Sequence, residues 1–144
     1  MTREFLYLFI RQHRLAVLAT TATGRQHAKT PHPEAAVIGF AVTKDFEIVF
    51  DTDKTSRKYA NLIAHPHTAL VIGWDNETTV QYEGVARELA ATEGDAYKEV
   101  YYSVYPDGRE RAKSWPNLTH FVIQPTWIRY SNFNDPPAIH EITF

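Results

Sequence analysis

A short basic segment near the middle of the chain has the residue types that bind a phosphate group. It consists of Ser56, Arg57 and Lys58, and the preceding Thr55 is predicted to cap a helix that ends at Ala64. The three residues would then occupy the first helical positions, where backbone N–H groups lack intrahelical acceptors and the helix dipole is positive. A hydroxyl, a guanidinium fork and an ammonium group all donate hydrogen bonds to phosphate oxygens. The segment therefore predicts an anion site.

An unliganded surface helix is the alternative interpretation of the same segment. The first turn of a helix prefers Asp or Glu, because basic side chains there face the positive end of the dipole. Adjacent Arg57 and Lys58 are therefore better explained by an anionic ligand. Surface helices that start with Lys or Arg are nevertheless common, so the local pattern leaves this alternative open.

The other polar residues form no recognisable catalytic or metal-binding motif. Pro66 separates the rings of His65 and His67, and no third ligand follows at a fixed spacing, so we interpret this segment as a solvated loop and predict no metal site. Ser56 lacks His and Asp partners with the spacing of a hydrolase triad. Neither glycine-rich phosphate loop, G-x-x-x-x-G-K-[ST] or G-x-G-x-x-G, is present. Catalytic residues are therefore not assigned from the sequence.

The composition indicates one ordinary globular domain. The chain has 144 residues, and we expect a single domain over residues 1–144. The net charge of -2 gives no global field that attracts nucleic acid. The longest apolar run, Ala35 to Val42, is shorter than the about 20 residues of a membrane span, and the N-terminus lacks a signal-peptide pattern. Without cysteine there is no disulfide or thiolate chemistry. We expect a cytoplasmic protein with no nucleic-acid or membrane partner.

The residue pattern predicts a mostly β chain, and the aromatic share of 13% suits the pleated surfaces of sheets. The predicted strands are Leu15–Thr21, Gln26–Thr30, Ala36–Val42, Glu47–Thr52, Thr68–Trp74, Thr78–Ala91, His120–Gln124, Trp127–Tyr130 and His140–Phe144. The predicted helices follow Thr2, Thr55 and Thr92. The last of them ends at Pro106, and Gly84 marks a bulge. Because the strands are mostly consecutive, we expect an antiparallel barrel with two to three flanking helices.

The order of these features resembles the pyridoxamine 5'-phosphate oxidase-like, FMN-binding split-barrel superfamily, nearest to its general stress protein branch. The specific part is a strand that ends in Phe50-Asp51-Thr52, followed by T-S-R-K-Y-A-N-L and His65-Pro66, and the similarity covers roughly residues 5 to 130. The resemblance implies an antiparallel split β-barrel with FMN as the cofactor. It also implies a homodimer in which each FMN lies in a groove between the two subunits.

The resemblance assigns one group of residues to the phosphate and polyol end of FMN. Arg57 and Lys58 would hold the phosphate, with Ser56 beside them. Asp51 and Thr52 would lie against the ribityl chain and the ring. For each of these residues the alternative is an ordinary position in a strand or a helix.

A second group would surround the isoalloxazine ring. The strand residues Ala36, Val37 and Ile38 would face the ring mainly through backbone groups. Thr79 or Gln81 would approach the ring from the neighbouring strand, and this assignment depends on the strand register.

Two departures from the family pattern bear on activity. The family's oxidases carry basic residues on the strand under the ring, whereas Ala36 to Ala41 contains no Arg or Lys, and the C-terminal R-x-H-x-R signature is missing. We therefore expect flavin binding without pyridoxamine phosphate oxidase activity. The leading hypothesis is an FMN-dependent oxidoreductase of unknown small-molecule substrate, in which the flavin carries the chemistry. The alternatives are a non-catalytic binder of flavin, deazaflavin or haem in stress response, or a dimeric interaction module without a cofactor.

Overall fold

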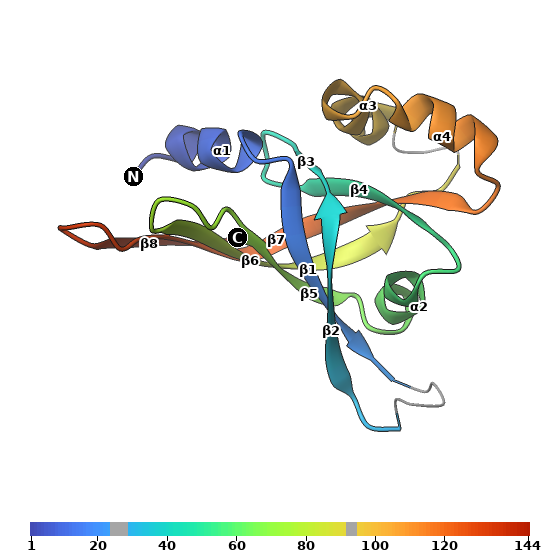
Figure 1. The fold of residues 1–144 in the computed structure, drawn as a ribbon, viewed down its shortest axis with the longest axis horizontal. Helices are drawn as coiled ribbons and strands as arrows, with labels where there is room; N and C mark the ends of the chain where they lie inside the picture. The colour runs from blue at the N-terminus through green and yellow to red at the C-terminus, as the bar shows by residue number, and fades with distance from the viewer. Residues whose placement is uncertain (24–28, 92–94) are drawn as a thin grey trace.

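The computed structural model describes residues 1–23, 29–91 and 95–144, which contain four helices and eight strands. In chain order these are α1 Arg3–Arg11, β1 Leu15–Ala22, β2 His32–Gly39, β3 Ala41–Val42, β4 Ile48–Asp53, α2 Arg57–Ala64, β5 His67–Ile72, β6 Thr78–Glu88, α3 Asp95–Val104, α4 Gly108–Ser114, β7 Leu118–Asn132 and β8 Ala138–Thr143 (Figure 1). Among the described residues, no helix has the length and hydropathy needed to cross a membrane.

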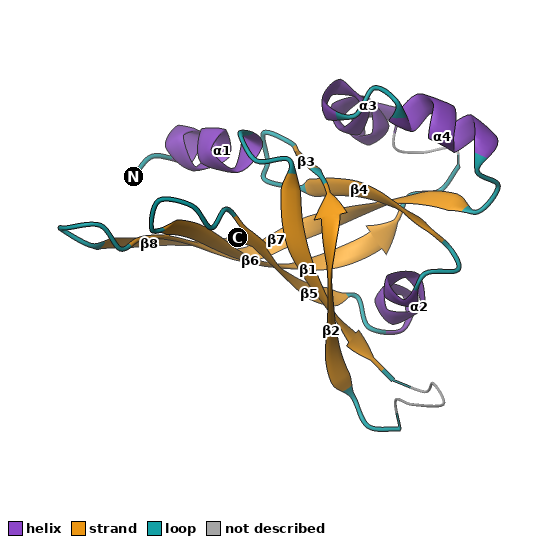
Figure 2. Ribbon diagram, in the orientation of Figure 1, coloured by secondary structure: helices purple, strands orange, loops and turns teal. Residues whose placement is uncertain are grey.

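The strands form one antiparallel sheet that curls into a half-barrel. Their order is β2-β1-β5-β6-β7-β4-β3. Strand β8 lies off this path and pairs with the C-terminal half of β7. Every strand pair in the described part of the chain is antiparallel. The curl brings β2 into contact with β4 although four strands separate them in this order, and the helices lie outside the strands (Figure 2). The predicted antiparallel split-barrel class is confirmed, with four helices in place of two to three.

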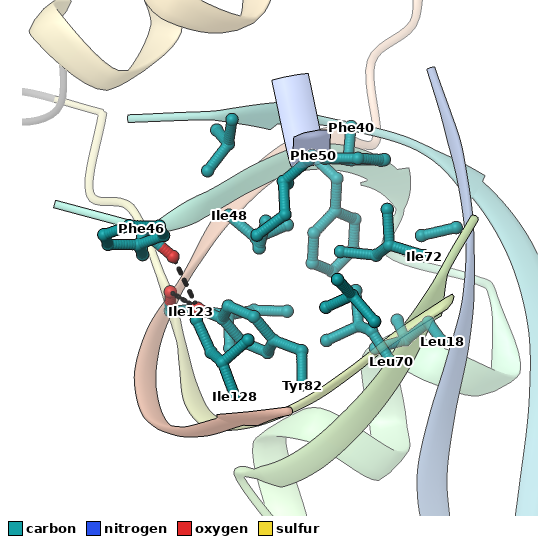
Figure 3. Close-up of a cluster of buried hydrophobic side chains, with 14 of the residues drawn as sticks. Leu18, Phe40, Phe46, Ile48, Phe50, Leu70, Ile72, Tyr82, Ile123 and Ile128 are labelled. Atoms are coloured by element: carbon teal, nitrogen blue, oxygen red, sulfur yellow. Dashed lines mark hydrogen bonds between the residues drawn. The ribbon is translucent and has the colours of Figure 1, made fainter. Parts of the chain in front are cut away.

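The core fills the concave side of the sheet. Side chains that are opposite one another across the strands share a face, so Leu18 of β1, Leu70 of β5 and Tyr82 of β6 form one buried row. The Tyr82 hydroxyl donates to the carbonyl oxygens of Phe46, at 2.8 Å, and Ile123, at 3.0 Å (Figure 3). Burial raises the pKa of Tyr82 well above its usual range. The hydroxyl is therefore a neutral donor that links β6 to β7 and to the loop between β3 and β4.

The helices cover different parts of the sheet. Helix α1 packs its buried side chains against the core, with the Thr2 hydroxyl capping the backbone N–H of Phe5 as predicted. Helix α2 packs on β1 and β6. Helix α3 lies over β3 and β4 and covers a second, smaller apolar cluster with Tyr101 at its centre. Helix α4 contacts α3 and β7.

Several strand limits differ from the prediction for a physical reason. Strand β2 starts at His32 and includes Pro33, which lacks a donor, because β2 is an edge strand. Lys29 and Thr30 form a bend instead of a strand, and the rest of the predicted strand Gln26–Thr30 lies outside the described residues, as does Thr92.

The register between β6 and β7 shifts at Gly84, where the sequence predicts a bulge, but the extra residue is Thr126 of β7 and not Gly84 itself. A Cβ atom added at Gly84 would lie 2.4 Å from the carbonyl oxygen of Gln124, so the close approach of the two strands requires glycine here. Next to this bulge, β7 passes through Pro125 without a break, and it joins two segments that the sequence predicts as separate strands.

Candidate functional site

Helix α2 begins one residue later than the sequence predicts. The Ser56 hydroxyl accepts the backbone N–H of Tyr59 at 3.3 Å and is the N-cap, so Arg57 is the first helical residue. Thr55 instead donates its backbone N–H and its hydroxyl to the Asp53 carboxylate, at 2.8 and 2.6 Å. These two hydrogen bonds hold Thr55 in the turn before the helix and lower the pKa of Asp53. The prediction of Thr55 as the cap is therefore wrong.

The end of β4 positions the cap. Thr52 is the buried residue of the strand end, and its hydroxyl oxygen lies 3.0 Å from that of Ser56. The structure thus brings together two residues that the sequence predicts for the same site. Because Ser56 serves the helix as its cap, its hydroxyl is fixed in place next to the first helical N–H groups.

A hollow of about 180 Å³ lies between the start of α2 and the edge strand β2. Its lining residues are Leu18, Thr20, Glu34, Ala35, Ala36, Arg57, Lys58 and Asn61. Three residues of the predicted site, Ala36, Arg57 and Lys58, therefore meet here. Small side chains on β2 face two cations on α2, which is an arrangement that admits an anionic group.

Glu34 and Asn61 belong to this hollow, and the sequence analysis did not assign them. The Glu34 carboxylate lies 3.1 Å from Arg57 Nη1 and accepts a hydrogen bond from Asn61 Nδ2 at 2.9 Å. Asn61 also contacts the Thr20 hydroxyl at 3.0 Å. Two sequence signals point to Asn61: it is part of the T-S-R-K-Y-A-N-L block, and it lies one helical turn after Arg57, on the same face of α2.

Asp51 lies on the opposite face of β4 from Thr52. Its carboxylate accepts a hydrogen bond from the Tyr101 hydroxyl at 3.0 Å and lies 3.4 Å from Arg111 Nη2. Burial, and then the charge of Asp51, raise the pKa of Tyr101. Asp51 therefore contacts α3 and α4 in one subunit, and the structure does not bring it together with Ser56.

The remaining predicted residues divide between the two faces of the sheet. On β2, Ile38 is buried on the concave side with Ala36, whereas Val37 points to the convex side and is 61% exposed. Gln81 also lies on the convex side, where strand pairing places it in one row with Val37. Thr79 is two residues earlier on the same face of β6.

A second polar group lies under α3, on the other side of β4 and β7. His120 is 5% exposed, and its Nε2 atom has no hydrogen-bond partner among the described residues. The edges of the Tyr101 and Tyr102 rings pack against the imidazole. Desolvation lowers the pKa of His120. Within the described ranges, no three His, Asp or Glu side chains gather in a way that could hold a metal ion.

Comparison with protein families identifies one over most of the chain. Residues 2–132 match the family described as pyridoxamine 5'-phosphate oxidase. The pyridoxine/pyridoxamine 5'-phosphate oxidase of Thermosynechococcus vestitus (strain NIES-2133 / IAM M-273 / BP-1) is 39% identical over 66 residues, which are 45% of this chain and 31% of that protein. The protein of the same name from Bordetella avium (strain 197N) is 33% identical over 87 residues, which are 50% of this chain and 41% of that protein. The chain thus spans less than half the length of these curated relatives.

Solved structures share the fold at low sequence identity. A heme binding protein from Mycobacterium smegmatis superposes with a TM-score of 0.79 and 14% identity, over 99% of this chain and 58% of that chain. General Stress Protein 26 from Bacillus anthracis str. Sterne superposes with a TM-score of 0.68 and 20% identity, over 97% of this chain and 98% of that chain. A pyridoxamine 5'-phosphate oxidase-related, FMN binding protein from Nostoc punctiforme PCC 73102 superposes with a TM-score of 0.65 and 12% identity, over 98% of this chain and 94% of that chain. These likenesses show the fold.

Proposed function

The chain belongs to the pyridoxamine 5'-phosphate oxidase family, and on that premise we propose that it binds FMN with the phosphate group at the start of α2. The observation that carries the proposal is the hollow in which Arg57 and Lys58 face the small side chain of Ala36. The first N–H groups of α2, two cations and a fixed Ser56 hydroxyl are donors that suit a phosphate dianion. A structural neighbour that is named an FMN binding protein supports the same cofactor.

The size of the hollow bears on where the flavin ring would lie. At about 180 Å³ the hollow is smaller than the roughly 300 Å³ at the lower end of ordinary ligand pockets. It has room for a phosphate and part of a polyol chain. The isoalloxazine ring would therefore extend beyond the hollow, along β2, and a complete site needs a further wall.

We propose that a second copy of the chain supplies this wall. The convex face of the sheet carries a row of residues across four strands, Val37, Val17, Val71 and Gln81. Val37 is 61% exposed and Val71 is 39% exposed, so the row is an apolar stripe in a single subunit. A homodimer through this face would cover the stripe and bring Gln81 and Thr79 close to the ring. This arrangement accounts for predicted site residues on both sides of β2.

The proposed activity is that of an FMN-dependent oxidoreductase with a small-molecule substrate. Bound FMN would supply the redox chemistry, and the residues of the chain would bind the phosphate, orient the ring and exclude water. We propose that the substrate is not pyridoxamine phosphate, because Ala36 to Ala41 offers no basic side chain and the C-terminal R-x-H-x-R signature is absent.

Titration with FMN tests the proposal. Flavin absorbance between about 350 and 500 nm, together with fluorescence, should report saturable binding by the full chain. The double variant Arg57→Ala, Lys58→Ala should lose most of the affinity and the FMN-induced rise in melting temperature. The matched control is Arg109→Ala, Lys113→Ala, which removes two cations from α4 and should bind FMN as the wild type does. If both double variants bind FMN equally well, the proposed phosphate position is wrong.

Reduction experiments then separate an enzyme from a carrier. The FMN-loaded protein is mixed with NADH or NADPH without oxygen, and the flavin absorbance is followed over time. Bleaching at a rate well above that of free FMN supports an oxidoreductase. FMN that binds tightly but is reduced no faster than free FMN favours the non-catalytic alternative.

A further inference from the structure

Glu34 places a negative charge inside the hollow that would receive a phosphate. Its carboxylate lies 3.1 Å from Arg57 Nη1 and 3.6 Å from His32 Nε2. The Glu34 side chain is 11% exposed, whereas that of Arg57 is 68% exposed. The carboxylate is thus in the wall of the hollow, and the guanidinium group reaches it from the solvent side.

Two strands and a helix hold this carboxylate in place. Glu34 on β2 is directly opposite Thr20 on β1, so the two side chains are on the same face of the sheet. Asn61 is buried on α2 and donates to both, at 2.9 Å to Glu34 Oε1 and 3.0 Å to the Thr20 hydroxyl. Because a buried amide anchors it, Glu34 cannot leave the hollow without breaking hydrogen bonds between β1, β2 and α2.

The charges of the hollow follow from this arrangement. Arg57 and Lys58 are its two lining cations, and Glu34 is its lining anion. A phosphate group near α2 would have to share Arg57 with Glu34 and would be repelled by the carboxylate. Such repulsion costs affinity in proportion to the charge of the ligand, and it acts on every phosphate compound alike. A small phosphate has no further contacts that offset this cost, whereas a ligand with an aromatic ring does.

We propose that Glu34 lowers the affinity of the site for every phosphate compound by competing with the ligand's phosphate for Arg57, so that only a ligand with further contacts binds appreciably. The inference rests on the proposed function, because it takes the phosphate site at α2 as given. Free phosphate and small phosphate esters are rejected, and FMN is retained because its ring binds outside the hollow. Removal of the Glu34 charge therefore makes the site a better general phosphate binder.

The test compares Glu34→Gln with the wild type against three probes. Glutamine keeps the side-chain length, and its Oε1 atom can still accept from Asn61. FMN should bind about fivefold more tightly to the variant, the size expected for a partly exposed charge pair. Inorganic phosphate, measured by competition with FMN, should gain at least as much. Riboflavin, which lacks the phosphate, should bind both proteins equally. The matched control Glu110→Gln removes an exposed carboxylate on α4 and should leave all three affinities unchanged.

Opposite results overturn the inference. If Glu34→Gln weakens FMN binding, the carboxylate orients Arg57 for the ligand and does not compete with it. A gain that is equal for riboflavin and FMN would also contradict the proposal, because the effect would not involve the phosphate. Glu34→Ala serves as a second variant if the glutamine variant unfolds, and it should show the same pattern. Failure of the proposed function is recognised separately, since then the wild type does not bind FMN in the first titration.

Discussion

At the scale of single residues, His120 connects burial to the pH dependence of stability. Its pKa is lowered from 6.5 because the imidazole is desolvated under α3. The unfolded chain therefore takes up a proton at a higher pH than the folded chain does. The contribution of His120 to the free energy of unfolding is fully present above about pH 6.5, and it is lost as the pH falls through the pKa of the folded state.

The variant His120→Phe tests this pH dependence. Phenylalanine keeps ring-edge contacts with Tyr101 and Tyr102 but does not titrate. Urea unfolding at a series of pH values should show that, as the pH falls below about 6.5, the free energy of unfolding of the wild type decreases more steeply than that of the variant. His67→Gln, a change at an exposed position, should retain the slope of the wild type. Parallel curves for His120→Phe and the wild type would rule out a contribution from His120.

Residue patterns along the chain identified part of the candidate site. Arg57 and Lys58 could be predicted because their chemistry and their place at a helix start are local features. Glu34 could not, because its approach to Arg57 depends on the pairing of β1 with β2 and on the packing of α2. The choice between Thr55 and Ser56 as the cap was decided by one side chain, that of Asp53.

At the scale of elements, buried carboxylates attach α3 to the barrel. Glu47 accepts hydrogen bonds from the Tyr97 hydroxyl at 2.6 Å and from Gln124 Nε2 at 2.7 Å. The hydrogen bond to Glu47 is the main cause that raises the pKa of Tyr97. Because Glu47 is buried, loss of one donor leaves its charge less well satisfied, and α3 loses a direct link to the strands.

Tyr97→Phe measures this link. The variant should unfold with a free energy lower than that of the wild type by about 1–3 kcal/mol, the range for a hydrogen bond to a charged group. Tyr102→Phe is the matched control on the same helix, because no hydrogen bond of the Tyr102 hydroxyl is seen among the described residues, and it should cost much less. Equal losses in urea unfolding would mean that packing, and not the hydrogen bond to Glu47, attaches α3.

The elements that the sequence missed lie at special turns. The segment Pro106-Asp107-Gly108 indicates the end of a helix, yet Gly108 also begins α4, with Asp107 as the N-cap. Pro125 indicates the end of a strand, but the bulge opposite Gly84 allows β7 to continue. Pro125, a residue that normally interrupts a strand, is thus accommodated by a partner distant in the sequence. Local propensity alone cannot reveal such a partner.

At the scale of the whole molecule, the succession of strands was enough to predict an antiparallel barrel, because hairpin-connected strands pair with their neighbours. The pattern could not predict how far the sheet curls or which convex residues stay exposed. Those two features decide whether one subunit can form a complete site. In this chain Val37 and Val71 of the convex row are exposed in one subunit, and the proposed dimer would cover them.

The variant Val37→Glu therefore tests the assembly and the site together. A carboxylate at the β2 end of the apolar stripe should be solvated in one subunit but buried and unpaired in a dimer, so the mass measured by light scattering should shift from dimer to monomer. FMN affinity should fall about tenfold or more although Arg57 and Lys58 are intact, because the ring loses the wall of the second subunit. Leu8→Glu, at a 49% exposed apolar position on α1, should leave both measurements unchanged. If Val37→Glu is monomeric and still binds FMN as the wild type does, a single subunit forms the whole site and the proposed interface groove is wrong.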